Sequence, residues 1–144
     1  MANKVNQVND WQKFWEVMGQ NKDPIAATDR PTVSPETYRA YCREIEQKLE
    51  LKPDDILLDI GCGTGLMDAY LSSCVKKVFA TDYAFNMAKA TGATTARFDN
   101  TFALNCAAKP APFPDQAFSK VLLYAVTQYL SPPEFLNILG ELKR

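Results

Sequence analysis

Short, nearly continuous apolar runs recur along the chain and alternate with segments of helical periodicity. Four such runs, each typical of a strand buried on both faces of a parallel sheet, occupy residues 56–60, 78–81, 102–106 and 121–126. Apolar residues at helical spacing predict helices at 10–18, 35–51, 66–73 and from 132 onward, and a further helix begins near Phe85. Strands that alternate with helices imply right-handed crossovers and a parallel sheet. The pattern therefore predicts an α/β fold.

Polar residues at the expected helix starts support these boundaries. Asp10 is predicted to cap the first helix, and Ser34 to cap the second after a turn-rich connection at residues 21–35. Ser131 and Glu134 have the spacing of a capping box at the start of the last helix.

Composition and charge exclude several classes of protein. With 144 residues, 47% of them apolar, and a net charge of −1, the chain has the size and balance of one globular domain. No run of 18 apolar residues is present to span a membrane, and the polar N-terminal 15 residues do not resemble a signal peptide. The balanced charge leaves no electrostatic footprint for nucleic acid. We therefore expect a cytoplasmic protein with no membrane or nucleic-acid partner.

The chain contains no histidine, which removes the commonest general base and the commonest zinc ligand. Its four cysteines, at positions 42, 62, 74 and 106, form no CxxC pair. This spacing indicates reduced thiols and no metal site. Hydrolases with a histidine-based catalytic pair and zinc enzymes are both disfavoured.

The residues with the clearest chemical meaning are three glycines that follow the first apolar run. Gly61, Gly63 and Gly65 join this predicted strand to the next helix, an arrangement that directs backbone N–H groups and a helix dipole at a ligand. Asp82 lies 21 residues after Gly61, at the end of the next strand, where a carboxylate can bind both hydroxyls of a ribose. The spacing GxGxG, with Leu66 in place of the last glycine of GxGxxG, argues against an NAD-type domain.

At this point the chain resembles the class I S-adenosylmethionine-dependent methyltransferases, in particular those that act on small molecules. The resemblance rests mainly on the segment Leu57-Leu58-Asp59-Ile60-Gly61-Cys62-Gly63-Thr64-Gly65. Thr81-Asp82-Tyr83 with Asn86-Met87 is similar to the family's ribose motif, and Pro112–Phe118 to its LPFPDxSF segment. The resemblance covers residues 36–144, and residues 1–35 resemble the helical lid and linker of such enzymes.

The resemblance implies a Rossmann-like, doubly wound parallel sheet of strand order 3-2-1-4 with an N-terminal helical lid. It also implies S-adenosylmethionine as cofactor, S-adenosylhomocysteine as product, and a small-molecule methyl acceptor. The cofactor-binding residues that it implies are Asp59, Gly61, Cys62, Gly63, Gly65, Asp82, Tyr83, Met87, Asn105, Ala107 and Tyr124. Asp59 would lie near the methionine amino group, Asp82 would bind the ribose, and Tyr83 and Met87 would pack on the adenine. No catalytic residue is assigned.

The chain departs from the family pattern in its adenine contact. Ala107 replaces the acidic residue that usually meets the adenine amino group, which leaves Asn105, a backbone carbonyl or Asp99 as candidates for that contact. Ser119 replaces the usual aspartate after the Pro112–Phe118 segment.

The family's last three strands have no counterpart before Arg144, so we expect a truncated domain. The fourth strand would then form an open apolar edge through which chains could self-associate. A SAM-binding module without catalysis is therefore an alternative to an enzyme.

Two groups of aromatic residues allow two interpretations each. Trp11, Phe14 and Trp15 form either a substrate lid or ordinary core packing. Tyr124, Gln128 and Tyr129 follow the fourth strand, where the acceptor should bind, and are either substrate contacts or packing residues.

Overall fold

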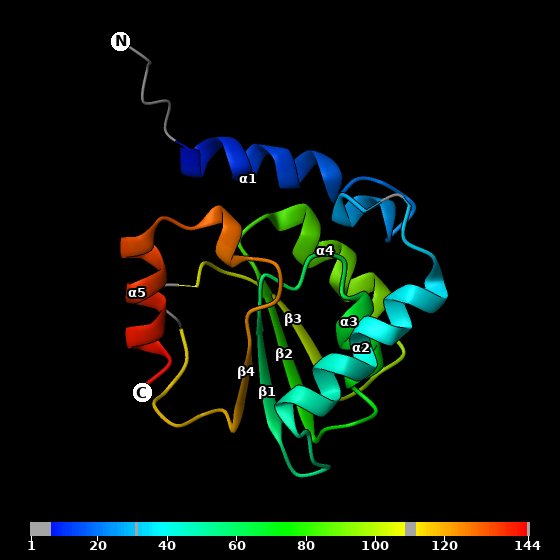
Figure 1. Ribbon diagram of the computed structural model, residues 1–144, viewed down its shortest axis with the longest axis vertical. Helices are drawn as coiled ribbons and strands as arrows, with labels where there is room; N and C mark the ends of the chain where they lie inside the picture. The colour runs from blue at the N-terminus through cyan, green and yellow to red at the C-terminus, as the bar shows by residue number, and fades with distance from the viewer. Residues whose placement is uncertain (1–6, 31, 109–111, 144) are drawn as a thin grey trace.

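Four parallel strands form one sheet that is flanked by helices (Figure 1). The computed structural model describes residues 7–30, 32–108 and 112–143. The strands are β1 (Ile56–Ile60), β2 (Lys77–Asp82), β3 (Thr101–Asn105) and β4 (Lys120–Leu122). Their order is β3-β2-β1-β4, which confirms the predicted order. All strands point the same way, so their carboxyl ends meet at one edge of the sheet.

The helices are α1 (Gln7–Met18), α2 (Pro35–Leu49), α3 (Leu66–Leu71), α4 (Phe85–Thr94) and α5 (Pro132–Glu141), with short 3₁₀ turns at Ala26–Thr28 and Thr127–Tyr129. The predicted cap of α2 is confirmed, because Ser34 Oγ accepts a hydrogen bond from the Thr37 N–H at 3.2 Å. The capping box at the start of α5 is also present. The predicted cap of α1 is wrong: the helix begins at Gln7, and Asp10 lies in its first turn, where its charge suits the helix dipole.

Both faces of the sheet are covered, as expected for a doubly wound fold. Alternate side chains of β1 point to opposite faces. Leu57 belongs to a buried cluster with residues of α2 and α3, and Leu58 to a second cluster with Ile138 of α5. These two clusters hold the helices on the sheet and leave its carboxyl edge free for a site.

The third strand begins one residue earlier than predicted, whereas the fourth is shorter than predicted. Apolar residues at 121–126 predict a six-residue strand, but β4 ends at Leu122. Ala125 has a left-handed backbone with φ 57°, so the chain turns away from the sheet. The Leu123 side chain then packs in the cluster beneath α5. The run is apolar because its residues pack against the core, not because all of them belong to a strand.

Strand β4 pairs with β1 and, within the described residues, with no other strand. At its start, Ser119 replaces the usual family aspartate and joins β4 to β1: its Oγ accepts from the Ile56 N–H at 2.9 Å and donates to Asp55 Oδ1 at 2.7 Å. No strand of the described residues pairs with the outer edge of β4, and self-association through this edge stays a prediction.

Helix α1 lies across the carboxyl edge of the sheet, in the position predicted for a lid (Figure 1). Ala84, at the N-cap of α4, offers no side-chain cap. The Glu16 carboxylate of α1 serves instead, accepting from the N–H of Phe85 at 2.6 Å and of Asn86 at 2.9 Å. Gly19 allows close approach, since a Cβ there would lie 2.7 Å from the backbone of Asn86. Helix α1 is thus attached to the domain through the start of α4, and its role as a lid stays a prediction.

Replacing Glu16 with alanine is expected to destabilise the fold by about 1 kcal/mol, because two N–H groups at the start of α4 lose their acceptor. Urea unfolding measures this cost, and hydrogen exchange at Phe85 and Asn86 should accelerate. Glu44→Ala, which removes an exposed ion pair with Lys48, is the matched control and should change stability by less than about 0.5 kcal/mol. Equal effects of the two substitutions would contradict the capping role.

Candidate functional site

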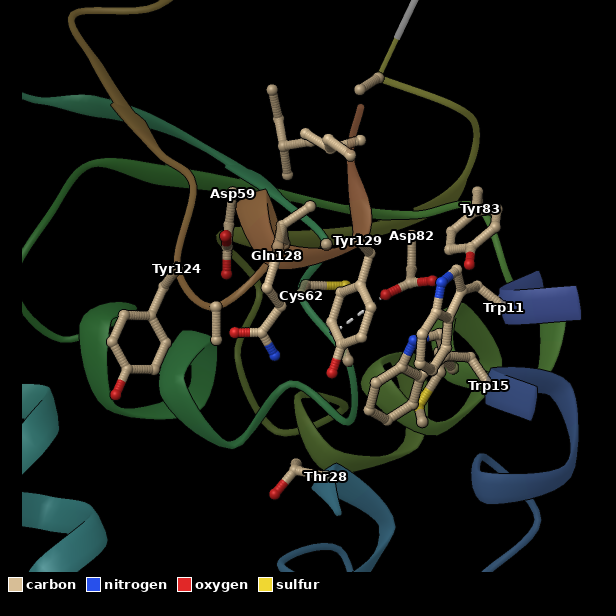
Figure 2. A pocket seen from close by; sticks show the side chains of 18 of the residues that line it. Trp11, Trp15, Thr28, Asp59, Cys62, Asp82, Tyr83, Tyr124, Gln128 and Tyr129 are labelled. Carbon is tan, nitrogen blue, oxygen red and sulfur yellow. Dashed lines mark hydrogen bonds between the residues drawn. The ribbon is translucent and has the colours of Figure 1, made fainter. Parts of the chain in front are cut away.

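A cavity of about 560 Å³ opens at the carboxyl edge of the sheet, between α1, α5 and the loops that follow β1, β2 and β4 (Figure 2). Crevices at this edge are where open α/β sheets bind their ligands. Trp11 and Trp15 line it from α1, and Glu134, Asn137 and Ile138 line it from α5.

The glycine loop after β1 is bound to its neighbours through its backbone. The N–H groups of Gly61 and Cys62 donate to the Thr81 carbonyl of β2 at 2.7 and 3.0 Å. From α4, the Thr91 hydroxyl donates to the Gly63 carbonyl at 2.8 Å. The loop is therefore held on both sides before any ligand binds.

All three loop glycines have a left-handed backbone, with φ of 80° at Gly61, 60° at Gly63 and 75° at Gly65. A Cβ would collide with the Val126 side chain at Gly61 and would lie 2.8 Å from Thr91 Cγ2 at Gly65. At Gly63 a Cβ would meet nothing within 4 Å. Gly61 and Gly65 thus serve the packing of the protein, whereas Gly63 borders open space in the cavity.

Asp82 links the glycine loop to the turn that follows β2. Its Oδ2 accepts from the Gly63 N–H at 3.0 Å and its Oδ1 from the Ala84 N–H at 2.9 Å. Burial raises the pKa of Asp82 to about 6, although these backbone donors act in the opposite direction. A carboxylate offers about four acceptor sites. Asp82 therefore retains capacity for donors from the cavity, toward which it points (Figure 2).

Two further carboxyl groups, those of Asp59 and Asp68, are buried beside the cavity. Asp59 Oδ1 and both oxygens of Asp68 accept no hydrogen bond from another described residue, but the two carboxyl groups form a hydrogen bond with each other when one of them is protonated. Burial, followed by the charge of Asp68, raises the pKa of Asp59, and burial raises the pKa of Asp68 to about 7. Asp59 lines the cavity, so this buried acidic pair borders the space in which a ligand would bind.

The structure brings most of the predicted site residues together. Those that line the cavity are Asp59, Gly61, Cys62, Gly63, Asp82, Tyr83, Met87, Ala107 and Tyr124. Gly65 and Asn105 do not line it. Gly65 packs on α4, and the Asn105 amide donates to the carbonyls of Asp82 at 2.9 Å and Tyr83 at 3.1 Å. Asn105 thus supports the turn after β2.

Asp99, considered as a substitute acidic residue, lies before β3 and therefore at the opposite end of the sheet. It does not line the cavity. Asp99 could meet the adenine amino group only if the third strand lay elsewhere in the sequence than predicted. The strand lies within one residue of its predicted position, so the Asp99 hypothesis is wrong.

Cavity residues that the pattern did not single out come from the segment between α1 and α2 and from the start of α2. Thr28, Asp29, Arg30 and Tyr38 all line the cavity. The Arg30 Nη1 donates to the Tyr124 hydroxyl at 3.4 Å. No periodicity marks the residues between 21 and 35, so only Tyr38, on the face of a predicted helix, could have been found from the sequence.

The aromatic residues of α1 line the cavity and also pack against one another. Trp11 and Trp15 contact the Tyr129 ring with centroid distances of 4.8 and 5.5 Å. The packing interpretation is confirmed for Trp11, Phe14 and Trp15. A role for these residues as a substrate lid stays a prediction.

Within residues 7–30, 32–108 and 112–143, no three His, Cys, Asp or Glu side chains are placed to hold a metal ion. The four cysteines form no disulfide. No helix in the described part of the chain is long and apolar enough to cross a membrane.

The parallel sheet has a glycine loop after β1 and an acidic residue at the end of β2. These features define a Rossmann-like domain that binds a nucleoside-containing cofactor. A family model described as a methyltransferase domain matches residues 57–144. The chain belongs to this family, whose members use S-adenosylmethionine.

Solved methyltransferase structures share the fold. Phosphoethanolamine N-methyltransferase 1 of Haemonchus contortus superposes with a TM-score of 0.82 at 18% identity, over 100% of this chain and 30% of that one. The N-methyltransferase NodS of Bradyrhizobium japonicum, in complex with S-adenosylhomocysteine, gives 0.75 at 16% identity, over 91% and 65%. A SAM-dependent methyltransferase of Leishmania major gives 0.80 at 10% identity, over 95% and 55%.

The chain thus spans less than two thirds of the length of each of these structures. No curated protein matches it by sequence.

The buried carboxyl of Asp68 predicts an unusual pH dependence of stability. Its pKa in the folded protein, about 7, exceeds its ordinary value of about 4, so the folded state binds more protons in this range. Stability should therefore fall as pH rises from about 4 to 7. In Asp68→Asn, which is neutral at every pH, the melting temperature should rise most above pH 7, and part of the pH dependence should disappear.

The control for this measurement is Asp54→Asn, a change at a carboxylate on an exposed turn, which should leave the pH profile of the melting temperature unaltered. An Asp68→Asn profile parallel to that of the wild type would show that Asp68 does not titrate in this range.

Proposed function

We propose that this chain binds S-adenosylmethionine and forms the cofactor-binding part of an enzyme that methylates a small molecule. The observation that carries the proposal is the contact between Asp82 and the Gly63 N–H, at a cavity that Gly63 leaves open. We further propose residues 1–35 as the lid and linker and residues 36–144 as the cofactor-binding domain.

The nucleoside end of the cofactor fits the side of the cavity formed by β2. Asp82 keeps acceptor capacity for two ribose hydroxyls, and Gly63 leaves space where any larger residue would place a Cβ. Tyr83 and the fully buried Met87 line the same side and supply apolar surface for the adenine. Ala107 offers no side-chain acceptor, so the contact with the adenine amino group is assigned to the backbone.

The aminoacyl end fits the other side of the cavity. Asp59 lines the cavity as one member of a buried acidic pair with Asp68, and an ammonium group that binds there would stabilise the charged form of that pair. Tyr124 and Ala125 border this region at the end of the loop after β4. The residues present therefore suit the cofactor at both of its ends.

When bound, the cofactor supplies a sulfonium methyl group that is already activated. The chain would contribute position and exclusion of water. Asp59 and Asp82 would fix the two ends of the cofactor, while Trp11, Trp15 and Tyr129 would cover it. No general base is proposed among the cavity residues.

A small-molecule acceptor is supported by the size of the cavity, about 560 Å³, and by the aromatic side chains that line it. The related enzyme from Haemonchus contortus is a phosphoethanolamine N-methyltransferase. Gln128 and Tyr129 belong to the 3₁₀ turn Thr127–Tyr129 that follows β4, and both line the cavity. We propose these two residues as contacts of the methyl acceptor.

A cofactor-binding module without catalysis is the second candidate. It is favoured by β4, which in the described residues ends the sheet without a further strand. Methyl transfer by this chain, with candidate acceptors and labelled donor, separates the two: binding without transfer would favour the module.

The proposal predicts that calorimetry detects binding of S-adenosylhomocysteine and not of NAD. Asp82→Asn should weaken S-adenosylhomocysteine binding by about 1.5–3 kcal/mol, as expected for hydrogen bonds to a charged acceptor. Asp115→Asn, a change on an exposed turn far from the cavity, is the control. Binding of NAD alone, or unchanged affinity in Asp82→Asn, would contradict the proposal.

The open space at Gly63 gives a second test. Gly63→Ala should lower stability by about 1–2 kcal/mol because of its left-handed backbone, yet it should remain folded since its Cβ meets no neighbour. Its affinity for S-adenosylhomocysteine should fall at least tenfold, because the methyl group enters the space proposed for the ligand. Gly140→Ala, also in open space but away from the cavity, should bind normally.

A further inference from the structure

One wall of the cavity combines aromatic rings with a carboxylate. Trp11 and Trp15 line it from α1, and Tyr129 lines it from the 3₁₀ turn after β4. Glu134 lines the cavity from the first turn of α5. Figure 2 shows Trp11 and Trp15 beside Tyr129, with Tyr124 on the opposite side of the cavity. We call Trp11, Trp15, Tyr129 and Glu134 the aromatic wall.

The three rings of the aromatic wall are inclined to one another. The ring planes of Trp11 and Trp15 make angles of 62° and 83° with the plane of Tyr129. Rings in edge contact do not cover each other's faces as stacked rings do, so ring faces stay open to the cavity. The face of a tryptophan or tyrosine ring is the negative part of its quadrupole and attracts a cation.

Glu134 adds a full negative charge to this wall. Its Oε2 accepts from the N–H and the hydroxyl of Ser131 at 2.7 and 2.6 Å, and these contacts hold the pKa of Glu134 below its ordinary value. From the described residues Oε1 accepts no hydrogen bond. Because Ser131 is two residues after Tyr129, the same contacts fix the carboxylate near the aromatic rings with one oxygen free for a ligand.

No cation of the described chain neutralises the aromatic wall. The one basic side chain among the described residues that line the cavity is Arg30. Its guanidinium lies against Tyr124, 5.3 Å from the ring centroid and 3.4 Å from the hydroxyl, and therefore away from Trp11 and Trp15 (Figure 2). Within residues 7–30, 32–108 and 112–143, no lysine or arginine pairs with Glu134 or lies over the rings of this wall.

We propose that the aromatic wall binds a small amine as the methyl acceptor, with the nitrogen between the ring faces and the Glu134 carboxylate. This inference rests on the proposed function and adds to it the chemical class of the acceptor. Ring faces and a carboxylate attract the same positively charged group. An anionic group at this wall would instead be repelled by Glu134.

The aromatic wall also suits the charge that moves during methyl transfer. The reacting nitrogen is unprotonated, and its lone pair forms the bond to the methyl carbon while the carbon–sulfur bond breaks and leaves its electron pair on sulfur. The positive charge thus passes from sulfur to nitrogen, where the ring faces and the Glu134 carboxylate stabilise it. A product ammonium that still carries a proton releases it to water.

The test compares two ligands of the same shape, choline and the neutral alcohol in which a carbon atom replaces its nitrogen. Choline serves as the probe because its quaternary nitrogen resembles a methylated amine. Calorimetry is carried out on the full chain saturated with S-adenosylhomocysteine, which lacks the sulfonium charge. Choline should bind about tenfold more tightly than the neutral alcohol.

Substitutions then assign this preference to the aromatic wall. Glu134→Gln keeps an acceptor oxygen for the Ser131 N–H but removes the charge, so the preference for choline should fall about fivefold. Tyr129→Leu should also reduce the preference, and Tyr129→Phe, which restores a ring, should recover it. Glu44→Gln, a change on an exposed side chain of α2, is the matched control and should leave the preference as it is.

Three outcomes would overturn the inference: binding of neither probe by the chain loaded with S-adenosylhomocysteine, equal affinity for both probes, or a preference that survives in Glu134→Gln. A chain that does not bind S-adenosylhomocysteine would contradict the proposed function instead. That result is seen before either probe is added, so the two failures are distinguishable.

Discussion

The carboxylate of Asp82 joins the glycine loop to the start of α4, and the geometry of the site depends on it. One oxygen holds the Gly63 N–H of the loop after β1, and the other holds the Ala84 N–H at the start of α4. Helix α4 in turn binds Glu16 of α1 through its first N–H groups. The glycine loop, the turn after β2 and the lid are therefore connected through one buried acidic side chain and the helix that follows it.

The electrostatics of the cavity follow from burial. Removing Asp59, Asp68 and Asp82 from water disfavours their charged forms, and the pKa of each is raised. A ligand that brings hydroxyl donors and a positive charge would stabilise these groups. The cavity is thus bordered by buried acidic groups in a domain that lacks histidine.

The elements that depend only on residues adjacent in the sequence were predicted correctly. The strands β1 and β2 are short apolar runs, and the loop between β1 and α3 needs glycine because its backbone is left-handed at Gly61, Gly63 and Gly65. The fourth strand was predicted too long, since an apolar residue such as Leu123 can satisfy its burial against α5 as well as in a sheet. Burial explains why these residues are apolar, but the path of the backbone determines which of them belong to a strand.

Asn105 shows the same limit within the site. It lies within the third strand as expected and is the last residue of β3. Its amide donates to two backbone carbonyls, and Asn105 does not line the cavity.

From its residue pattern alone, this chain is assigned a parallel α/β sheet, a glycine loop and an acidic partner at Asp82, while the strand order followed from the resemblance to a known family. These depend on periodicity and on backbone conformation, which neighbouring residues dictate. The capping of α4 by Glu16, the contact of Arg30 with Tyr124 and the burial of Asp59 beside Asp68 emerged only from the folded chain. Each of these depends on contacts between segments far apart along the chain, and such contacts arise only when the helices pack on the sheet.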